Sequence, residues 1–252
     1  MNDEELEKLE QEEREITDEA IAIMLLILAT VRDNLEKELR DFYQKYGSDG
    51  VVTYAEARKW VSQKNHQRRL TALMLMISLE FNLALEKLEI EFEKMLRSVI
   101  SKESEFFDIE FDEDDVLESV WGADESNWLS RLEDDVTLWI AYIVSDWKRL
   151  ILQRKPINEV IKKLDLRFNS INSIVKKLGL TESTAIGSIA RRKVFKEIGI
   201  NKYRFYAKAD ERTCETCGSM HGLVFPMSAY EVGSTASPLH PHCRCWEVPI
   251  MD

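Results

Sequence analysis

The sequence predicts a mainly α protein in which long antiparallel helices precede a small α+β cap at the C-terminus, held together by Cys and His residues. Glycine and proline are scarce, with 9 and 5 among 252 residues, against an ordinary combined share of about 12%. Residues 1–46 and 51–121 contain neither, and four of the five prolines lie beyond residue 225. We therefore expect helices over most of the chain and a loop-rich segment at its end.

Apolar residues predict two long helices in the first hundred residues. From Leu6 to Phe42 they recur at steps of three, four and seven, which is the period of one helix face. The glycine-containing residues 47–50 form a turn that ends this helix. Residues 53–56, Thr-Tyr-Ala-Glu, have the form of a capping box that opens a second helix, whose apolar stripe continues to Val99. Each helix is about 60 Å long at 1.5 Å per residue, as in an antiparallel helical arm.

Shorter elements are expected after this arm. The acidic residues 103–115 predict a poorly ordered connection, and a third helix is expected over about 126–154. Pro156 suits the first turn of a further helix that runs to about residue 166.

Two more helices are expected at residues 170–177 and 182–198, ended by Gly179 and Gly199. Residues 203–207 and 223–225 are rich in β-branched and aromatic residues and predict short strands.

The predicted domain organisation has three segments. Residues 1–120 form the long-helix arm, residues 121–200 a helical basic segment, and residues 201–252 the small Cys/His cap. The apolar stretch at residues 20–29 is too short to span a bilayer, and acidic residues precede it, so we expect a buried helix segment and no membrane partner.

Charge is unevenly distributed along the chain. The net charge is −12, which argues against a general nucleic-acid coat protein. Residues 141–209 contain 16 basic and 5 acidic residues, a net charge of +11, whereas residues 1–140 carry −19. This asymmetry has two interpretations, solvated helix faces or a basic surface that faces DNA or an acidic partner.

The basic residues nearest the cap are candidates for weak contact with double-stranded DNA. Aromatic residues lie between them and include Phe205, which is either a base-stacking residue or the buried side of a strand. The candidates are Arg191, Arg192, Lys193, Lys196, Lys202, Arg204 and Lys208.

All four cysteines lie in the last 39 residues, beside three of the four histidines. Cys214 and Cys217 are separated by two residues, and His240 and Cys243 repeat that spacing. Two such pairs supply the four thiolate and imidazole ligands of a tetrahedral zinc site, so we predict a structural zinc ion.

The fourth ligand stays open in this prediction. Cys245 shares a strand face with Cys243 if that segment is extended, and could replace His240. His242 is another competitor for the fourth position, and His221 is a weaker candidate.

Three other interpretations compete with zinc: a redox-active Cys pair, disulfides between the two pairs, or four reduced buried thiols. The redox interpretation lacks a βαβ context. The absence of an export signal favours a reducing compartment over disulfides. No deaminase, zincin, phosphate-loop or nucleophile-elbow motif is present, so no catalytic residue is assigned and we expect no enzymatic activity.

Ordered strings in the C-terminal half resemble the phage Mu F-like head morphogenesis proteins, which are minor capsid proteins of tailed phages. They are Asp210-Glu-Arg-Thr-Cys-Glu-Thr-Cys217, Gly222-Leu-Val-Phe225 and Pro238-Leu-His-Pro-His-Cys-Arg-Cys245. Trp121-Gly-x-Asp, with Trp128, Arg131 and Thr181-Glu182, also resembles the family pattern. Leu180 departs from it, because the family often has a basic residue there, and this puts a role of Glu182 in doubt.

The resemblance implies a virion protein at the portal vertex or in the head interior, present in the host cytoplasm during assembly. Its implied partners are the portal protein and scaffold or other head proteins, and its implied roles are head assembly and the packaging, retention or delivery of the genome. Two alternatives from other classes are a metal-dependent nuclease or toxin-like enzyme and a cellular zinc-binding adaptor. An acidic metal ligand beside the cluster would favour the enzyme, and Asp210, Glu211 and Glu215 are the candidates.

Overall fold

The computed structural model describes residues 3–122 and 126–251, which divide into two compact units. The cap unit comprises Met1–Ala22, Ile90–Arg131 and Lys176–Asp252, and the arm unit comprises Ile23–Glu89 and Leu132–Val175. The cap unit draws on all three segments predicted from the sequence and the arm unit on the first two. The division at residues 120 and 200 therefore stays a prediction.

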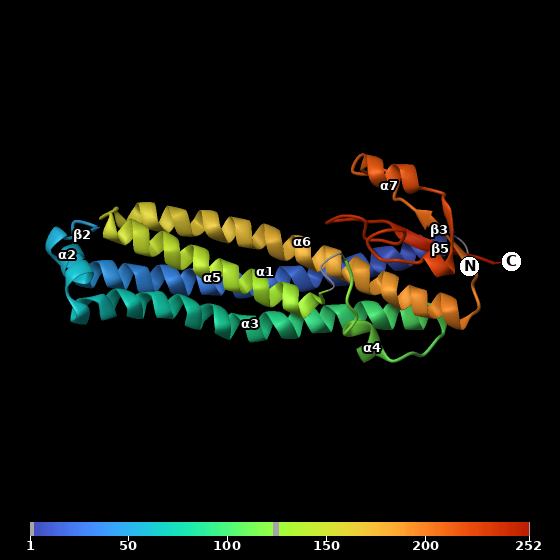
Figure 1. Ribbon diagram of the computed structural model, residues 1–252, viewed down its shortest axis with the longest axis horizontal. Coiled ribbons are helices and arrows are strands. Elements are labelled where there is room, and N and C mark those ends of the chain that lie inside the picture. The colour runs from blue at the N-terminus through green and yellow to red at the C-terminus, as the bar shows by residue number, and fades with distance from the viewer. Residues whose placement is uncertain (1–2, 123–125, 252) are drawn as a thin grey trace. The chain divides into compact units, whose positions relative to one another are not determined.

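Most elements are helices (Figure 1), and several have residues in both units. The helices are α1 (Asp3–Tyr46), α2 (Tyr54–Ser62), α3 (Lys64–Phe107), α4 (Glu113–Leu117), α5 (Trp128–Leu152), α6 (Ile157–Glu197) and α7 (Glu215–Met220). The strands are β1 (Gly47–Ser48), β2 (Val51–Val52), β3 (Lys202–Tyr206), β4 (Val224–Pro226) and β5 (Trp246–Ile250), and one turn of 3-10 helix covers Met227–Ala229. The predicted mainly α fold with a small C-terminal sheet is confirmed. Within the described residues, the helices include none that is long and apolar enough to cross a membrane.

The arm unit packs segments of α1, α3, α5 and α6 around an apolar core. Phe81 of α3 lies at its centre, with its ring 5.9 Å from that of Phe168 and 6.3 Å from that of Trp139. Polar contacts join the helices at the surface, where Arg32 of α1 donates to Asp165 of α6 at 2.8 Å. The 3.6-residue pattern of buried apolar residues thus produces the helical packing expected from the sequence.

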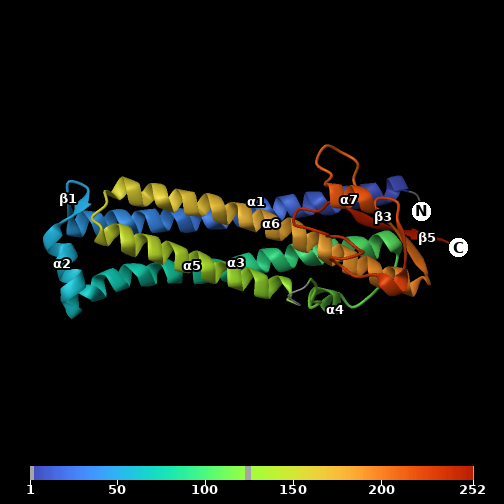
Figure 2. The same cartoon turned by 45° about the horizontal axis from the view of Figure 1, so that its top comes forward.

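The predicted turn and helix start are confirmed at the end of the arm unit. β1 and β2 pair as a hairpin, and Gly50 has φ +73°, a conformation that glycine adopts without strain. The Thr53 hydroxyl accepts from the Glu56 amide at 3.2 Å, as a helix N-cap does. The hairpin and α2 lie at the same end of this unit in both views (Figure 2).

The prediction of a single second helix is wrong, because the helix is interrupted between α2 and α3. Gln63 has φ −119° and ψ 116°, which is extended backbone. Trp60 of α2 is buried, with its ring 5.1 Å from that of Phe42 and 5.8 Å from that of Tyr46. This packing holds α2 against the end of α1, in a direction that α3 does not continue (Figure 1).

The prediction of a poorly ordered connection at the acidic residues 103–115 is also wrong. α3 continues to Phe107, with Glu103 fully buried. α4 follows, and the Asp112 carboxylate caps it by accepting from the Asp114 amide at 3.0 Å. Aspartate at a helix start satisfies free amides, which a count of charges does not reveal.

Residues 157–197 form one helix instead of the three that were predicted. Gly179 lies inside α6, where an added Cβ would be 2.9 Å from Cγ1 of Ile21 on α1. This glycine permits close helix packing and is not a helix end. Gly199, with φ +75°, does follow the helix end as predicted.

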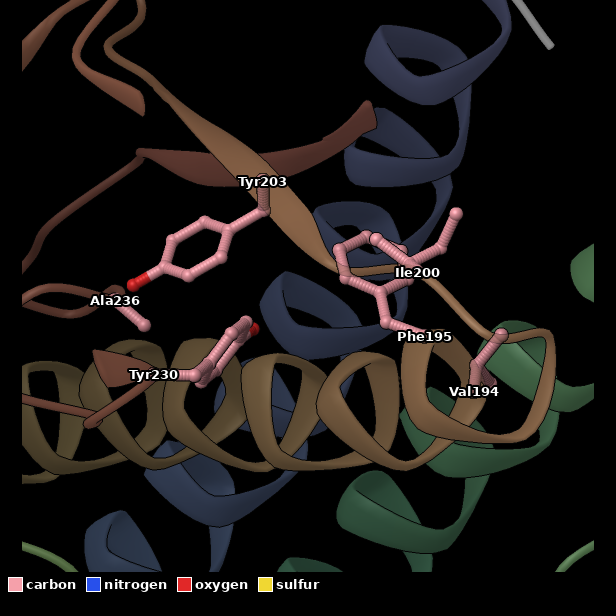
Figure 3. Packing of buried hydrophobic residues seen from close by; sticks show 6 residues of the cluster. All are labelled: Val194, Phe195, Ile200, Tyr203, Tyr230 and Ala236. Carbon is pink, nitrogen blue, oxygen red and sulfur yellow. The ribbon is translucent and has the colours of Figure 1, made fainter. Parts of the chain in front are cut away.

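The cap unit contains an antiparallel sheet in the order β4-β3-β5. β3 and β4 confirm the two predicted strands, whereas β5 and α7 were not predicted. Beneath the sheet, the buried Phe195 of α6 packs with Tyr203 of β3 and Tyr230, and the two tyrosine rings lie 4.6 Å apart (Figure 3). This apolar cluster fixes β3, and thereby the loops on either side of it, against α6.

Candidate metal centre

The first Cys pair is positioned by the start of α7. Cys214 is the N-cap residue, and its sulfur accepts from the Cys217 amide at 3.3 Å. This capping contact brings the two thiols to one side of a single turn. Cys217 is buried and Cys214 is half-buried.

The second half of the cluster comes from the loop before β5. The Cys243 amide donates to the His240 carbonyl at 3.1 Å, which closes a tight turn. β5 pairs with β3 from Trp246 onward, so this turn is held beside the sheet. His240 Nδ1 lies 2.8 Å from the Pro241 carbonyl, which orients the ring.

The two halves meet at Cys217. His240 Nε2 lies 3.1 Å from the sulfur of Cys214 and 3.2 Å from that of Cys217. On its other side, Cys217 is 3.8 Å from the sulfur of Cys243. Two sets of donors within 4.8 Å of one another result, Cys214 with Cys217 and His240, and Cys217 with Cys243 and Cys245.

These spacings fit a tetrahedral ion with soft ligands. Bond lengths of about 2.3 Å to sulfur and about 2.0 Å to nitrogen give edges of about 3.8 Å between sulfurs and about 3.5 Å between sulfur and nitrogen. The edge between Cys217 and Cys243 has this length, and those to His240 are shorter by a few tenths of an ångström. The structure thus brings together all five predicted donors, with Cys217 common to both sets, and a metal ion fits their chemistry.

The other two histidines of this region lie outside both donor sets. His221 Nδ1 accepts from the Ala207 amide at 3.1 Å, and its ring packs on Tyr206. His242 is exposed, and its amide donates to Thr181. Neither contributes to the cluster in this arrangement.

Burial and mutual contact set the protonation of the thiols. Burial raises the pKa of Cys217 to about 12. The Cys245 thiol, by donating to Cys243, lowers the pKa of Cys243 to about 5. Backbone donation from Cys217 lowers the pKa of Cys214. The cluster by itself therefore does not favour three thiolates together, whereas a bound divalent cation stabilises them.

The three acidic candidates contribute to neither donor set within the described residues. Asp210 is paired with Arg244, at 2.5 Å to Nη2, and this ion pair holds the pKa of Asp210 well below its usual range. Glu211 and Glu215 are exposed. The donors near the thiols are thus soft ones, as in structural zinc sites.

The pattern of Trp121, Arg131 and Glu182 forms a second, buried constellation in the cap unit. Glu182 is 1% exposed and accepts from Arg131 Nη1 at 2.7 Å and from Trp121 Nε1 at 2.8 Å. The Arg131 guanidinium also lies 4.3 Å from the Trp121 ring centre. Glu182 therefore has a defined structural role despite Leu180. Asp124, from the same sequence pattern, lies outside the described residues.

A third buried constellation was not predicted. Arg191 is 1% exposed, and its guanidinium pairs with Glu103 and, at 2.8 Å, with Glu10. Glu13 lies at 3.9 Å. Glu13 could have indicated this buried cluster, because it is a charged residue among the apolar positions of one helix face.

The remaining basic candidates lie at or near the surface. Arg192 is half-buried over the Tyr230 ring, Lys193 pairs with Asp115, and Lys208 is 4.0 Å from Glu7. Three others are exposed, namely Lys196, Lys202 and Arg204. Phe205 is fully buried, which confirms the strand interpretation of that residue. Arg191 is buried among carboxylates and is therefore not part of this exposed basic surface.

Residues 157–248 match the family model described as Phage Mu protein F like protein. The resemblance predicted from the Cys/His strings is confirmed for this part of the chain, which contains α6, most of the sheet and all five donors. A search of curated proteins and a search of solved structures found no significant match.

Proposed function

Because residues 157–248 are a Phage Mu protein F-like segment, we propose that the protein is a minor head protein of a tailed phage or prophage. It associates with the portal vertex and acts in head assembly and in packaging, retention or delivery of the genome. The family match carries this proposal. The long helices support it, because they suit contact across an assembly better than catalysis, and residues 1–140 carry a charge of −19 that a basic partner would complement.

The Cys/His cluster is proposed to be a structural zinc site. Cys214, Cys217 and two of His240, Cys243 and Cys245 hold the ion, and the absence of carboxylates from these donor sets, within residues 3–122 and 126–251, supports a structural role over hydrolysis. A small sheet with few core residues gains stability from such a link.

Reduced protein is expected to contain close to one zinc per chain. Cys217→Ser should lose this metal, because Cys217 belongs to both donor sets. His242→Ala should retain it, because His242 belongs to neither. Elemental analysis of the purified variants measures both outcomes, and metal-free unmodified protein with freely titrating thiols would rule the site out.

We place the portal contact on the acidic residues 1–140, which carry a charge of −19. A surface of this charge needs basic patches on its partner. Co-expression of the full chain with the portal protein encoded beside it should give a complex that dissociates as salt rises. Lack of a portal gene nearby, or lack of any complex, would contradict the proposed function.

A further inference from the structure

Three leucines lie exposed in a row on α3, in the arm unit. Leu75, Leu79 and Leu83 are 63%, 49% and 52% exposed. Their spacing of four places them on one face of the helix. The buried face of the same helix is a different one and includes Ile77 and Phe81, both 0% exposed. Solvent-facing positions of a helix are usually polar, so a row of exposed leucines marks a contact surface.

Charged residues flank this row, with opposite signs at its two ends. Arg68 precedes Leu79 by eleven residues and Glu86 follows it by seven, and at about 100° per residue both lie within about 20° of its direction. Both are exposed, and within the described chain neither forms a salt bridge. We call Arg68, Leu75, Leu79, Leu83 and Glu86 the leucine face.

We propose that the leucine face binds the leucine face of a second copy of this chain, with the two α3 helices antiparallel and a two-fold axis at Leu79. In this register Leu75 meets Leu83 of the second copy, and Leu79 meets its own equivalent. Arg68 then lies opposite Ile90 of the second copy, which is 62% exposed on the same face, and about 6 Å along the axis from Glu86. The long Arg68 side chain can bridge this offset to Glu86 of the second copy, which brings opposite charges together at both ends of the contact.

The sequence of this face favours a second copy over an unrelated partner. The leucine positions are symmetric about Leu79, and only an antiparallel pairing makes the helix's own end charges complementary. A parallel pair would place Arg68 beside Arg68 and Glu86 beside Glu86. A symmetric contact of one surface with itself is the commonest way in which proteins form dimers.

The dimer is expected to be weak. One helix face with three leucines gives an interface at or below the lower end of stable contacts, about 1,200 Å² in total. Dissociation should therefore fall in the micromolar range. End charges contribute chiefly to the orientation of the pair.

Sedimentation velocity on the full chain across the micromolar range tests this proposal. The unmodified chain should change from monomer to dimer with concentration, and Leu79→Glu should weaken the dimer at least about tenfold. Leu166→Glu is the matched control, because Leu166 is 53% exposed on α6 and should leave the dimer unchanged. Circular dichroism confirms that each variant remains helical.

A charge exchange tests the antiparallel register. Arg68→Glu should weaken the dimer, and Arg68→Glu combined with Glu86→Arg should restore it. A chain that is monomeric at every concentration, or a dimer that Leu79→Glu leaves intact, would overturn the proposal. Failure of the double variant to recover would overturn the antiparallel arrangement. The proposal does not rest on the proposed function.

Discussion

At the scale of single residues, the cap unit is distinguished by charged side chains inside its core. Glu182, Glu103, Arg191 and Glu247 are each at most 1% exposed. Glu247 is satisfied by the Ser188 and Tyr230 hydroxyls, at 3.0 and 3.1 Å, and by the Ser237 amide. Buried charges need such partners, so each makes the packing around it specific.

Replacing one member of the Trp121–Arg131–Glu182 constellation should be costly. Arg131→Met removes the guanidinium 2.7 Å from the buried Glu182 carboxylate and should lower the free energy of unfolding by about 3–5 kcal/mol. Chemical denaturation measures the change. Adding Glu182→Gln to Arg131→Met should recover part of the loss, and a loss below about 1 kcal/mol for Arg131→Met would contradict this role.

Stability should depend on pH through Glu103. Its pKa is raised to about 7, chiefly by burial, with Glu10 also raising it and Arg191 opposing the shift. Burial also raises the pKa of the neighbouring Glu13. The folded protein therefore binds a proton at Glu103 more tightly than the unfolded chain does. The resulting stabilisation of the folded state is fully present below about pH 4.5, the ordinary pKa of this side chain, and is lost as pH rises through about 7.

Thermal denaturation at pH 5 and pH 8 measures this effect. The change in stability from pH 5 to pH 8 should be less favourable for the unmodified chain than for Glu103→Gln, because the pH dependence of the proposed zinc site is common to both. The exposed Glu105→Gln is the control and should leave the difference unchanged. An equal change with pH in the unmodified chain and in Glu103→Gln would contradict the prediction.

At the scale of secondary structure, helices with regular apolar spacing and the turn at residues 47–50 were predictable, whereas the break at Gln63 and the continuity of α6 were not. The stripe from Leu6 to Phe42 and the capping residue Thr53 depend on neighbours in sequence, which the sequence displays. Gly179 and the break at Gln63 depend on contacts with α1, through Ile21 in one case and Phe42 in the other. A glycine in a sequence does not distinguish a helix end from a close approach between helices.

The candidate site was predictable for the same reason. Regular spacing identified the five donors, whose closeness the structure confirms. Arg191 was mistaken for a surface residue because its partners Glu10 and Glu103 are about ninety or more residues away in sequence. Contacts at that separation leave no local pattern.

Gly179→Ala should destabilise the protein although alanine favours helices. The new Cβ would lie 2.9 Å from Ile21 Cγ1, and the resulting strain of about 1–3 kcal/mol exceeds the gain of about 1 kcal/mol in helix propensity. Thermal denaturation should show a lower midpoint. Gly218→Ala in α7 is the matched control, because an added Cβ there has nothing within 4 Å. A higher midpoint for Gly179→Ala would contradict the close-packing interpretation.

At the scale of the whole molecule, residues of opposite charge are concentrated in different parts of the sequence. Residues 141–209 carry +11, and residues 1–140 carry −19. Several basic residues near the cap are already paired with acidic ones, as Lys193 is with Asp115. The exposed Lys196, Lys202 and Arg204 remain available to phosphates, so any affinity for DNA should be modest and strongly dependent on salt.

Neutralising these three residues together should weaken DNA binding by the full chain. With Lys196→Gln, Lys202→Gln and Arg204→Gln, the slope of log affinity against log salt should fall by about 0.9 for each lost phosphate contact. Fluorescence anisotropy with a short duplex measures it. The matched control replaces Lys8, Lys37 and Lys87, exposed in the acidic part, with Gln. Equal loss in both triple variants would show that only total charge matters.

The interleaving of the two units has a consequence for synthesis on the ribosome. The arm unit is complete in sequence at Val175, whereas the cap unit needs Lys176–Asp252 to join Met1–Ala22. At about 5–20 residues per second, these last 77 residues take about 4–15 s to emerge. Until Arg191 has been made, Glu10 and Glu13 lack this partner, and the strands that complete the unit are made later still. Residues 1–22 therefore wait for residues 176–252 before all their native contacts can form, and during this wait a chaperone or an early-bound partner has time to act.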